Sequence, residues 1–196
     1  MRPSLPLALA IALLPALAAG GVIKPKVLAN FESTTAGPDG SEALVRAPST
    51  ATVRRVAEDG GQVLEVSGRQ ALQGMSGVRI TFLDEHGEKS PADASRYFYL
   101  TFLMRATAGA SRIQLRIADS PARTEPMDAG ELTRYLPEGL TADWRQVSVP
   151  LGAMALNKKG LYSISFLVLD PTDFTFAVDD IALKRDPEDD LPTPKR

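Results

Sequence analysis

Apolar and polar residues alternate with a period of two along most of the chain from residue 27 to residue 184. Such alternation is typical of β-strands, in which successive side chains point to opposite faces of a sheet. The segments that show it are ATVRRVA (51–57), QVLEVSG (62–68), GVRITFL (77–83), RYFYLTFLMRA (96–106), SRIQLRIAD (111–119), LTRYL (132–136), WRQVSVPL (144–151), YSISFLVLD (162–170) and FTFAVDDIALK (174–184). Many short strands at regular spacing predict an all-β fold, a two-sheet antiparallel β-sandwich or jelly roll.

The remaining segments are predicted to connect or flank these strands. A first strand is expected at about Val27 to Glu32, followed by the glycine-containing loop TTAGPDGSEA. The charged stretch DSPARTEPMDAGEL is expected to be a second long loop. Because the end of the chain is proline-rich, charged and almost without apolar residues, we expect a disordered tail over 186–196 and one domain over 27–185.

The first residues have the layout of a secretory signal peptide. Arg2 precedes an apolar run from Leu5 to Leu14, and small residues follow up to Ala18, where cleavage is expected. A membrane anchor is the alternative, but the run is short and broken by prolines, whereas a spanning helix needs about 20 apolar residues. We therefore expect a signal peptide over 1–18, a linker over 19–26, and export to the periplasm or the cell exterior.

Composition narrows the possible chemistry. The chain has no cysteine, which excludes disulfides, thiolate catalysis and cysteine-ligated zinc. Without Arg2 it carries 21 basic and 24 acidic side chains, a formal charge of −3. With this small acidic excess, the chain lacks the basic charge that nucleic-acid-binding proteins use to bind phosphates.

Two neighbouring strands predict a polar surface. In residues 96–106 the even positions from Phe98 to Met104 form the expected core side, and the tyrosines point away from it. Because only ATAGAS separates this strand from residues 111–119, we expect a hairpin whose polar faces coincide. With two later segments, the predicted ligand-binding surface comprises Tyr97, Tyr99, Gln114, Arg116, Arg134, Tyr135 and Gln146.

This predicted surface has two interpretations. Tyrosine rings offer stacking faces, and arginine and glutamine side chains hydrogen-bond hydroxyl groups, a set that suits a polar, extended ligand. Alternatively, the face is simply solvated, since antiparallel sheets commonly leave one face wet.

The adjacent carboxylates Asp179 and Asp180 interrupt the apolar pattern near the end of the chain. Phe174, Phe176 and Val178 share one parity and the apolar positions after the doublet share the other, so the phase slips by one residue. A β-bulge accounts for such a slip. The carboxylates then lie at an exposed edge, accept hydrogen bonds from a nearby loop, help to hold a calcium ion, or take part in catalysis.

Several segments together resemble a known fold group. They are the early Phe31-Glu32, YFYLTFLMRA, DWRQVSVPL (143–151), YSISFLVLD and the closing AVDDIAL. In this order they are similar to galactose-binding-like jelly rolls, most of all to family 11 carbohydrate-binding modules and the domain named for complex I intermediate-associated protein 30. The resemblance covers residues 27–185.

The resemblance implies two roles for particular residues. A structural calcium between the first and last strands maps onto Glu32 with Asp179 or Asp180. Trp144 maps onto a tryptophan that packs rather than serving as a sugar platform, in keeping with the usual burial of tryptophan.

Catalysis is not expected. His86 is the only histidine, and neither a nucleotide-binding glycine motif nor a recognisable pair of catalytic carboxylates is present. We expect a monomeric, non-catalytic binding module for a polysaccharide or envelope glycan. The alternative is a scaffold or assembly factor that holds a protein partner, which predicts a contiguous apolar patch from Leu103, Leu167 and Leu169.

Overall fold

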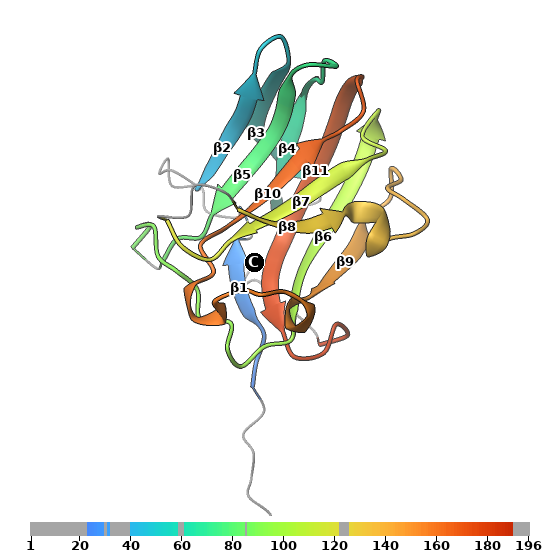
Figure 1. The fold of residues 1–196 in the computed structure, drawn as a ribbon. Coiled ribbons are helices and arrows are strands. Elements are labelled where there is room, and N and C mark those ends of the chain that lie inside the picture. The colour runs from blue at the N-terminus through green and yellow to red at the C-terminus, as the bar shows by residue number, and fades with distance from the viewer. Residues whose placement is uncertain are drawn as a thin grey trace, which may run out of the picture.

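The computed structural model describes residues 23–29, 31, 40–58, 61–84, 86–121 and 126–189. These residues form two antiparallel sheets that pack face to face, so the predicted β-sandwich is confirmed (Figure 1). Sheet A has the order β3-β4-β11-β6-β9, with β1 also beside β11, and sheet B has the order β2-β5-β10-β7-β8. No helix within the described ranges is long and apolar enough to cross a membrane.

The strands of sheet A are β1 (Lys26–Ala29), β3 (Thr50–Glu58), β4 (Gly61–Arg69), β6 (Tyr99–Ala108), β9 (Arg145–Pro150) and β11 (Asp173–Lys184). Those of sheet B are β2 (Ser41–Arg46), β5 (Met75–Thr81), β7 (Ile113–Ala118), β8 (Met127–Glu131) and β10 (Ser163–Val168). Three short 3-10 helices connect them: η1 (Leu132–Arg134), η2 (Leu151–Ala153) and η3 (Lys158–Gly160).

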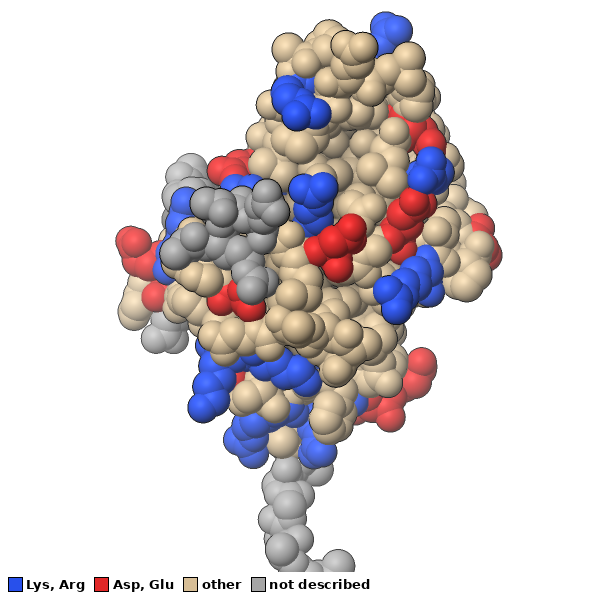
Figure 2. Space-filling model, in the orientation of Figure 1, with Lys and Arg blue, Asp and Glu red and all other residues tan. Residues whose placement is uncertain are grey.

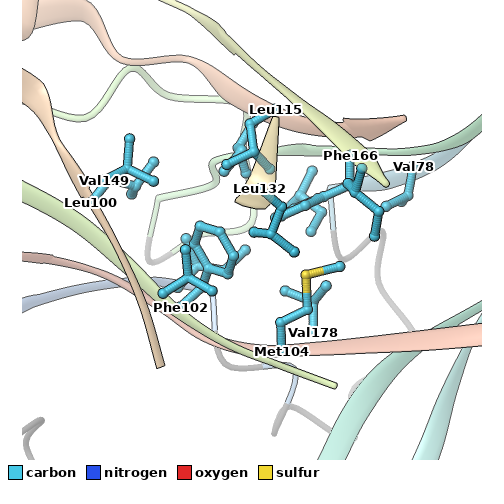
Figure 3. Packing of buried hydrophobic residues seen from close by; sticks show 14 of the residues in the cluster. Val78, Leu100, Phe102, Met104, Leu115, Leu132, Val149, Phe166 and Val178 are labelled. Carbon is cyan, nitrogen blue, oxygen red and sulfur yellow. The ribbon is translucent and has the colours of Figure 1, made fainter. Parts of the chain in front are cut away.

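The core lies between the two sheets and follows the predicted parity. Leu100, Phe102 and Met104 of β6 point inward and are almost fully buried. The ring of Phe102 meets the edge of Phe166 from β10, with centroids 5.1 Å apart and planes at 84° (Figure 3). Because burying such a side chain contributes about 1.5–3 kcal/mol, this layer holds the sheets together.

The chain crosses between the sheets at most of its connections, and the predicted hairpin between the two central strands is wrong. β6 pairs with β11 and β9 in sheet A, whereas β7 pairs with β10 and β8 in sheet B. Gly109 begins the crossover with φ +57, and a Cβ there would lie 1.9 Å from the carbonyl oxygen of Asp173. Only glycine fits this turn, which carries the chain to the other sheet instead of back along β6.

Three further predictions along the chain need correction. Residues 41–46 form edge strand β2, and part of the second predicted loop forms edge strand β8. LTRYL begins with η1 rather than forming a strand. Phe98 lies just before β6 and is 51% exposed beneath the guanidinium of Arg185, so it is not a core residue. The strands β2 and β8 were not predicted because an edge strand buries little, so its sequence need not alternate strongly.

The first and last strands pair with each other, and the predicted bulge is confirmed. Val27 lies opposite Ala182, and Ala29 lies opposite Ile181. Between Asp179 and Ala182, β11 has one residue more than the facing part of β6. Asp180 adopts φ 49, a left-handed conformation. This extra residue restores inward-pointing side chains on both sides of the doublet.

The start of the predicted tail forms a turn over sheet A. The backbone N–H of Asp186 donates to Asp189 at 3.0 Å, and that of Glu188 donates to Asp186 at 3.1 Å. The side chain of Gln146 donates to the carbonyl oxygen of Pro187 at 2.8 Å. The tail from residue 190 onward and the predicted signal peptide lie outside the described residues.

Candidate functional site

The outer face of sheet B has a floor of small side chains. In β10 the apolar residues Ile164, Phe166 and Val168 point into the core, so Ser163 and Ser165 point outward. Ser163 lies opposite Thr81 and Ala118, which are small as well, whereas Ser165 lies opposite Arg79 and Arg116. Both serines are 2% exposed, so they lie at the base of this face and are covered by the surrounding side chains.

Longer polar side chains flank this floor in a continuous row. Register places Glu42, Arg79, Ser165, Arg116 and Asp128 side by side across β2, β5, β10, β7 and β8. We call this row, with its outward neighbours Thr81, Ser163, Gln114 and Glu131, the polar face. Basic and acidic side chains are interspersed across this side of the molecule rather than separated by sign (Figure 2).

A pocket of about 370 Å³ opens at one end of the polar face. Its floor includes Thr81 and Ser163, and Arg79, Lys89 and Tyr162 are among the side chains that surround it. The pocket is also lined by Glu42, so it combines hydroxyl groups, the Arg79–Glu42 ion pair, the ammonium of Lys89 and one aromatic ring.

Several charges on the polar face are already paired. Arg79 donates to Glu42 at 2.9 Å, and Arg112 donates to Glu131 at 2.6 Å. The hydrogen bond from Arg112 lowers the pKa of Glu131 and in turn raises the pKa of Arg112. Both side chains are exposed, so solvent screening keeps these interactions weak.

The remaining side chains of the polar face include both bonded and unbonded groups. Gln114 donates to Asp128, which also accepts the backbone N–H of Gly130 at 2.7 Å. Among the described residues, neither Arg116 nor the hydroxyls of Ser163 and Ser165 make a side-chain hydrogen bond or ion pair. Ser163 and Ser165 are only 2% exposed, whereas Arg116 is exposed, so the guanidinium of Arg116 is the group that can bind a ligand without breaking an existing bond.

The structure divides the predicted binding residues among three places. Gln114 and Arg116 lie on the polar face. The strands that carry Tyr99 and Gln146 belong to sheet A, and Tyr97 packs against the core while its hydroxyl donates to Lys24 O at 3.2 Å. The merged surface expected from a hairpin is therefore wrong, because β6 and β7 present their polar sides on opposite faces of the sandwich.

Arg134 and Tyr135 lie beyond edge strand β8, at η1. Tyr135 packs against the core, and its hydroxyl donates to the carbonyl oxygen of Ala129. The guanidinium of Arg134 lies 5.9 Å from the centroid of the Tyr135 ring. Burial raises the pKa of Tyr135. The Tyr135 hydroxyl is thus already bonded within the protein.

Sequence reasoning missed the centre of the polar face. Ser163 and Ser165 had a detectable signal, because serine at alternate positions of a strongly apolar strand predicts a small, polar outer side. No sequence signal identified Arg79, Glu42 or Lys89, because β2 was not predicted and the neighbours of β5 depend on the strand order.

The carboxylates of the acidic doublet are half-buried at the β11 bulge. The side chain of Asp179 accepts the backbone N–H of Asp180 at 2.8 Å. Phe31, just beyond the end of β1, is buried with φ 54, and Glu32 lies outside the described residues. Carboxylates are donors that calcium prefers, but the described ranges contain no group of three or more His, Cys, Asp or Glu side chains placed to hold a metal.

Trp144 belongs to a polar cluster of sheet A rather than to the core. The guanidinium of Arg105 lies 4.9 Å from the centroid of the indole ring, and the indole N–H donates to Glu58 at 3.2 Å. Arg105 also forms an ion pair with Glu58 at 2.5 Å. The ring is therefore packed and hydrogen-bonded, although it is only half-buried.

The apolar residues expected to anchor a protein partner do not form one patch. Leu103 lies in sheet A, whereas Leu167 lies in sheet B and is 5% exposed. Leu169 follows β10 and is 36% exposed.

Comparison with solved structures places this fold among known modules. No protein-family model and no curated protein matches the chain. The family 11 carbohydrate-binding module of Clostridium thermocellum, solved with a β-1,3-1,4-mixed-linked tetrasaccharide, matches with a TM-score of 0.61 and 16% identity, over 84% of this chain and 97% of the module. The family 30 module of a cellulosomal cellulase of Clostridium thermocellum matches with a TM-score of 0.53 and 19% identity. The match covers 86% of this chain and 97% of the module.

A larger enzyme contains a similar unit. A β-1,2-glucanase from Parabacteroides distasonis matches with a TM-score of 0.57 and 24% identity, over 82% of this chain but only 25% of the glucanase. At these identities the likeness establishes architecture. The chain has the β-sandwich fold of the family 11 and family 30 carbohydrate-binding modules.

Proposed function

We propose that this protein is a non-catalytic carbohydrate-binding module that holds a glycan against the polar face of sheet B. The observation that carries the proposal is the exposed guanidinium of Arg116, which has no partner among the described residues and lies in the middle of the polar row. Arg116 and Gln114 lie on β7, beside the floor of small side chains on β10.

Such a face complements the chemistry of a sugar chain. A glycan presents hydroxyl groups that both donate and accept hydrogen bonds, as serine hydroxyls do, while arginine donates and glutamine does both. Each hydrogen bond contributes about 0.5–1.5 kcal/mol, so useful affinity requires several of them along an extended surface. The row across all five strands of sheet B provides that extent.

The comparisons support the choice of ligand class and the absence of catalysis. Family 11 and family 30 modules of similar length share the fold, and the family 11 module was solved with a mixed-linked tetrasaccharide. In the β-1,2-glucanase the matching unit is a minor part of the whole chain. We therefore propose a binding role, with β-glucans as the first probes.

Affinity electrophoresis tests this function. We expect the mature chain to be retarded in native gels that contain at least one neutral or acidic polysaccharide from a panel including mixed-linkage β-glucan, β-1,2-glucan and polygalacturonate. Ser165→Gln places a longer side chain on the floor of the polar face and is expected to abolish the retardation. Ser67→Gln makes the same change on β4 of sheet A and should leave it intact. If no polysaccharide retards the parent, the proposed function is wrong.

We further propose export and a structural calcium ion. Export is supported by the signal-peptide pattern of residues 1–18, which lie outside the described residues. Calcium held by Glu32 with Asp179 or Asp180 is supported by the pairing of β1 with β11 beside the acidic doublet. An ion at this position would connect the first strand to the last and supply no chemistry to the polar face.

A further inference from the structure

The acidic side chains of the polar face are already bonded, whereas two of its cations are not. Glu42 bonds Arg79, Glu131 bonds Arg112, and Asp128 accepts from Gln114 and a backbone N–H. Among the described residues, the side chains of Arg116 and Lys89 make no hydrogen bond or ion pair. The charge that the face leaves available to a ligand is therefore positive.

These two cations flank the hydroxyl floor from opposite sides. Arg116 lies on β7 directly opposite Ser165. Lys89 lines the pocket with Ser163 and pairs with Leu83, just after β5. Because β10 lies between β5 and β7, the two neighbouring strands are about 10 Å apart, twice the usual strand spacing. A ligand chain that extends from the pocket across β10 to β7 would contact both cations.

Aromatic stacking contributes little at this face. Tyr162 is the aromatic ring that the described residues bring to the pocket, while Tyr97 and Tyr99 belong to the other side of the sandwich. Affinity for a glycan must then come mainly from hydrogen bonds and charge. Charge-assisted hydrogen bonds are roughly twice as strong as neutral ones, and arginine pairs with carboxylates through two parallel bonds.

We propose that the ligand of the polar face is an acidic glycan, a chain that contains uronic acid residues. Its carboxylates pair with the exposed side chains of Arg116 and Lys89. This inference rests on the proposed function and specifies its substrate class. General attraction to polyanions is not the cause, since the whole chain has a formal charge of −2.

Affinity electrophoresis in polygalacturonate, compared with mixed-linkage β-glucan, tests the inference. We expect polygalacturonate to retard the parent protein, and added NaCl to weaken this retardation because salt screens exposed charges. Arg116→Gln and Lys89→Gln should each weaken binding about tenfold, since a hydrogen bond to a charged group contributes about 1.5–3 kcal/mol and 1.4 kcal/mol is tenfold. Arg116→Lys should retain part of the binding.

A matched control separates the site from bulk charge. Arg145→Gln removes an exposed arginine from β9 of sheet A and should leave polygalacturonate binding unchanged. An equal loss in Arg145→Gln and Arg116→Gln overturns the inference. So does retardation by β-glucan but not by polygalacturonate, in which case the proposed function stands. Melting curves confirm that each variant is folded.

Discussion

The outer faces of the two sheets carry similar polar residues but use them differently. On sheet A, Arg105 is bonded to Glu58 at 2.5 Å and covers the ring of Trp144, and Lys184 is 3% exposed. The ammonium of Lys184 donates to Gln146 at 3.2 Å and to the carbonyl oxygen of Pro187 at 3.1 Å. On sheet B, the exposed side chain of Arg116 has no such bond among the described residues, and neither do the hydroxyls of Ser163 and Ser165, which are 2% exposed.

The difference shows that polarity along a strand does not identify a binding face. Buried polar groups stabilise a fold when they are paired within the protein, and the cluster around Trp144 is of this kind. Exposed groups whose hydrogen-bonding capacity is unused, such as the Arg116 guanidinium, are the ones available to a ligand. The comparison between the sheets therefore separates the bonded polar groups of sheet A from the face of sheet B on which we propose that a glycan binds.

The largest expected effect comes from removing the core that both faces share. Phe166→Ala deletes a buried ring that contacts Phe102 and lies 6.4 Å from Phe176. We expect a loss of about 3–5 kcal/mol in the free energy of unfolding, measured by urea denaturation. A loss below about 1 kcal/mol would show that the two sheets do not depend on this layer.

Calcium would give sheet A a ligand of its own. If the ion binds only the folded protein, calcium at about 100 times its dissociation constant stabilises the fold by about 2.7 kcal/mol. Calorimetry with calcium and with a chelator measures this, and Asp179→Asn with Asp180→Asn should remove the difference. Equal unfolding temperatures in calcium and chelator would eliminate the proposed ion.

Removing one member of the Trp144 cluster should affect stability without affecting binding. Glu58→Gln deprives Arg105 of its ion pair, and the Arg105 side chain is only 25% exposed. Leaving a largely buried polar group unsatisfied costs about 1–3 kcal/mol, so we expect a loss in that range with unchanged polysaccharide retardation.

Glu65→Gln is the matched control for that variant, since it breaks an ion pair whose arginine, Arg54, is 63% exposed. This change should cost at most about 1 kcal/mol. A weaker retardation in Glu58→Gln would contradict the division of roles between the two sheets.

The smallest expected effect concerns the paired charges of the polar face. The hydrogen bond from Arg112 lowers the pKa of Glu131 below 4.5 in the folded protein. A lowered pKa stabilises the fold above the unfolded value, and this contribution is lost as the pH falls through the folded value. Arg112→Gln should therefore destabilise the protein slightly at neutral pH and not at strongly acidic pH. Urea denaturation at both pH values measures the change, and a constant difference would contradict it.

Local sequence patterns predicted much of the fold. The alternation in YFYLTFLMRA identified the inward Leu100, Phe102 and Met104, and the phase slip at Asp179 and Asp180 identified the bulge. Both are properties of a single strand, because a period of two and a one-residue insertion are visible without knowledge of the neighbouring strand. The edge strands β2 and β8 were missed because they bury too little to alternate clearly.

The sequence alone thus determined the strand character, the parity and the bulge, whereas the tertiary structure decided which polar side chains share a surface. The left-handed turn at Gly109 sends β7 into sheet B, which separates Gln114 and Arg116 from Tyr99. It is the pairing of β10 with β5 and β7 that brings Arg79 and Arg116 to either side of Ser165. Neighbours in a sheet come from strand order, which depends on the packing of the whole core and not on any one segment.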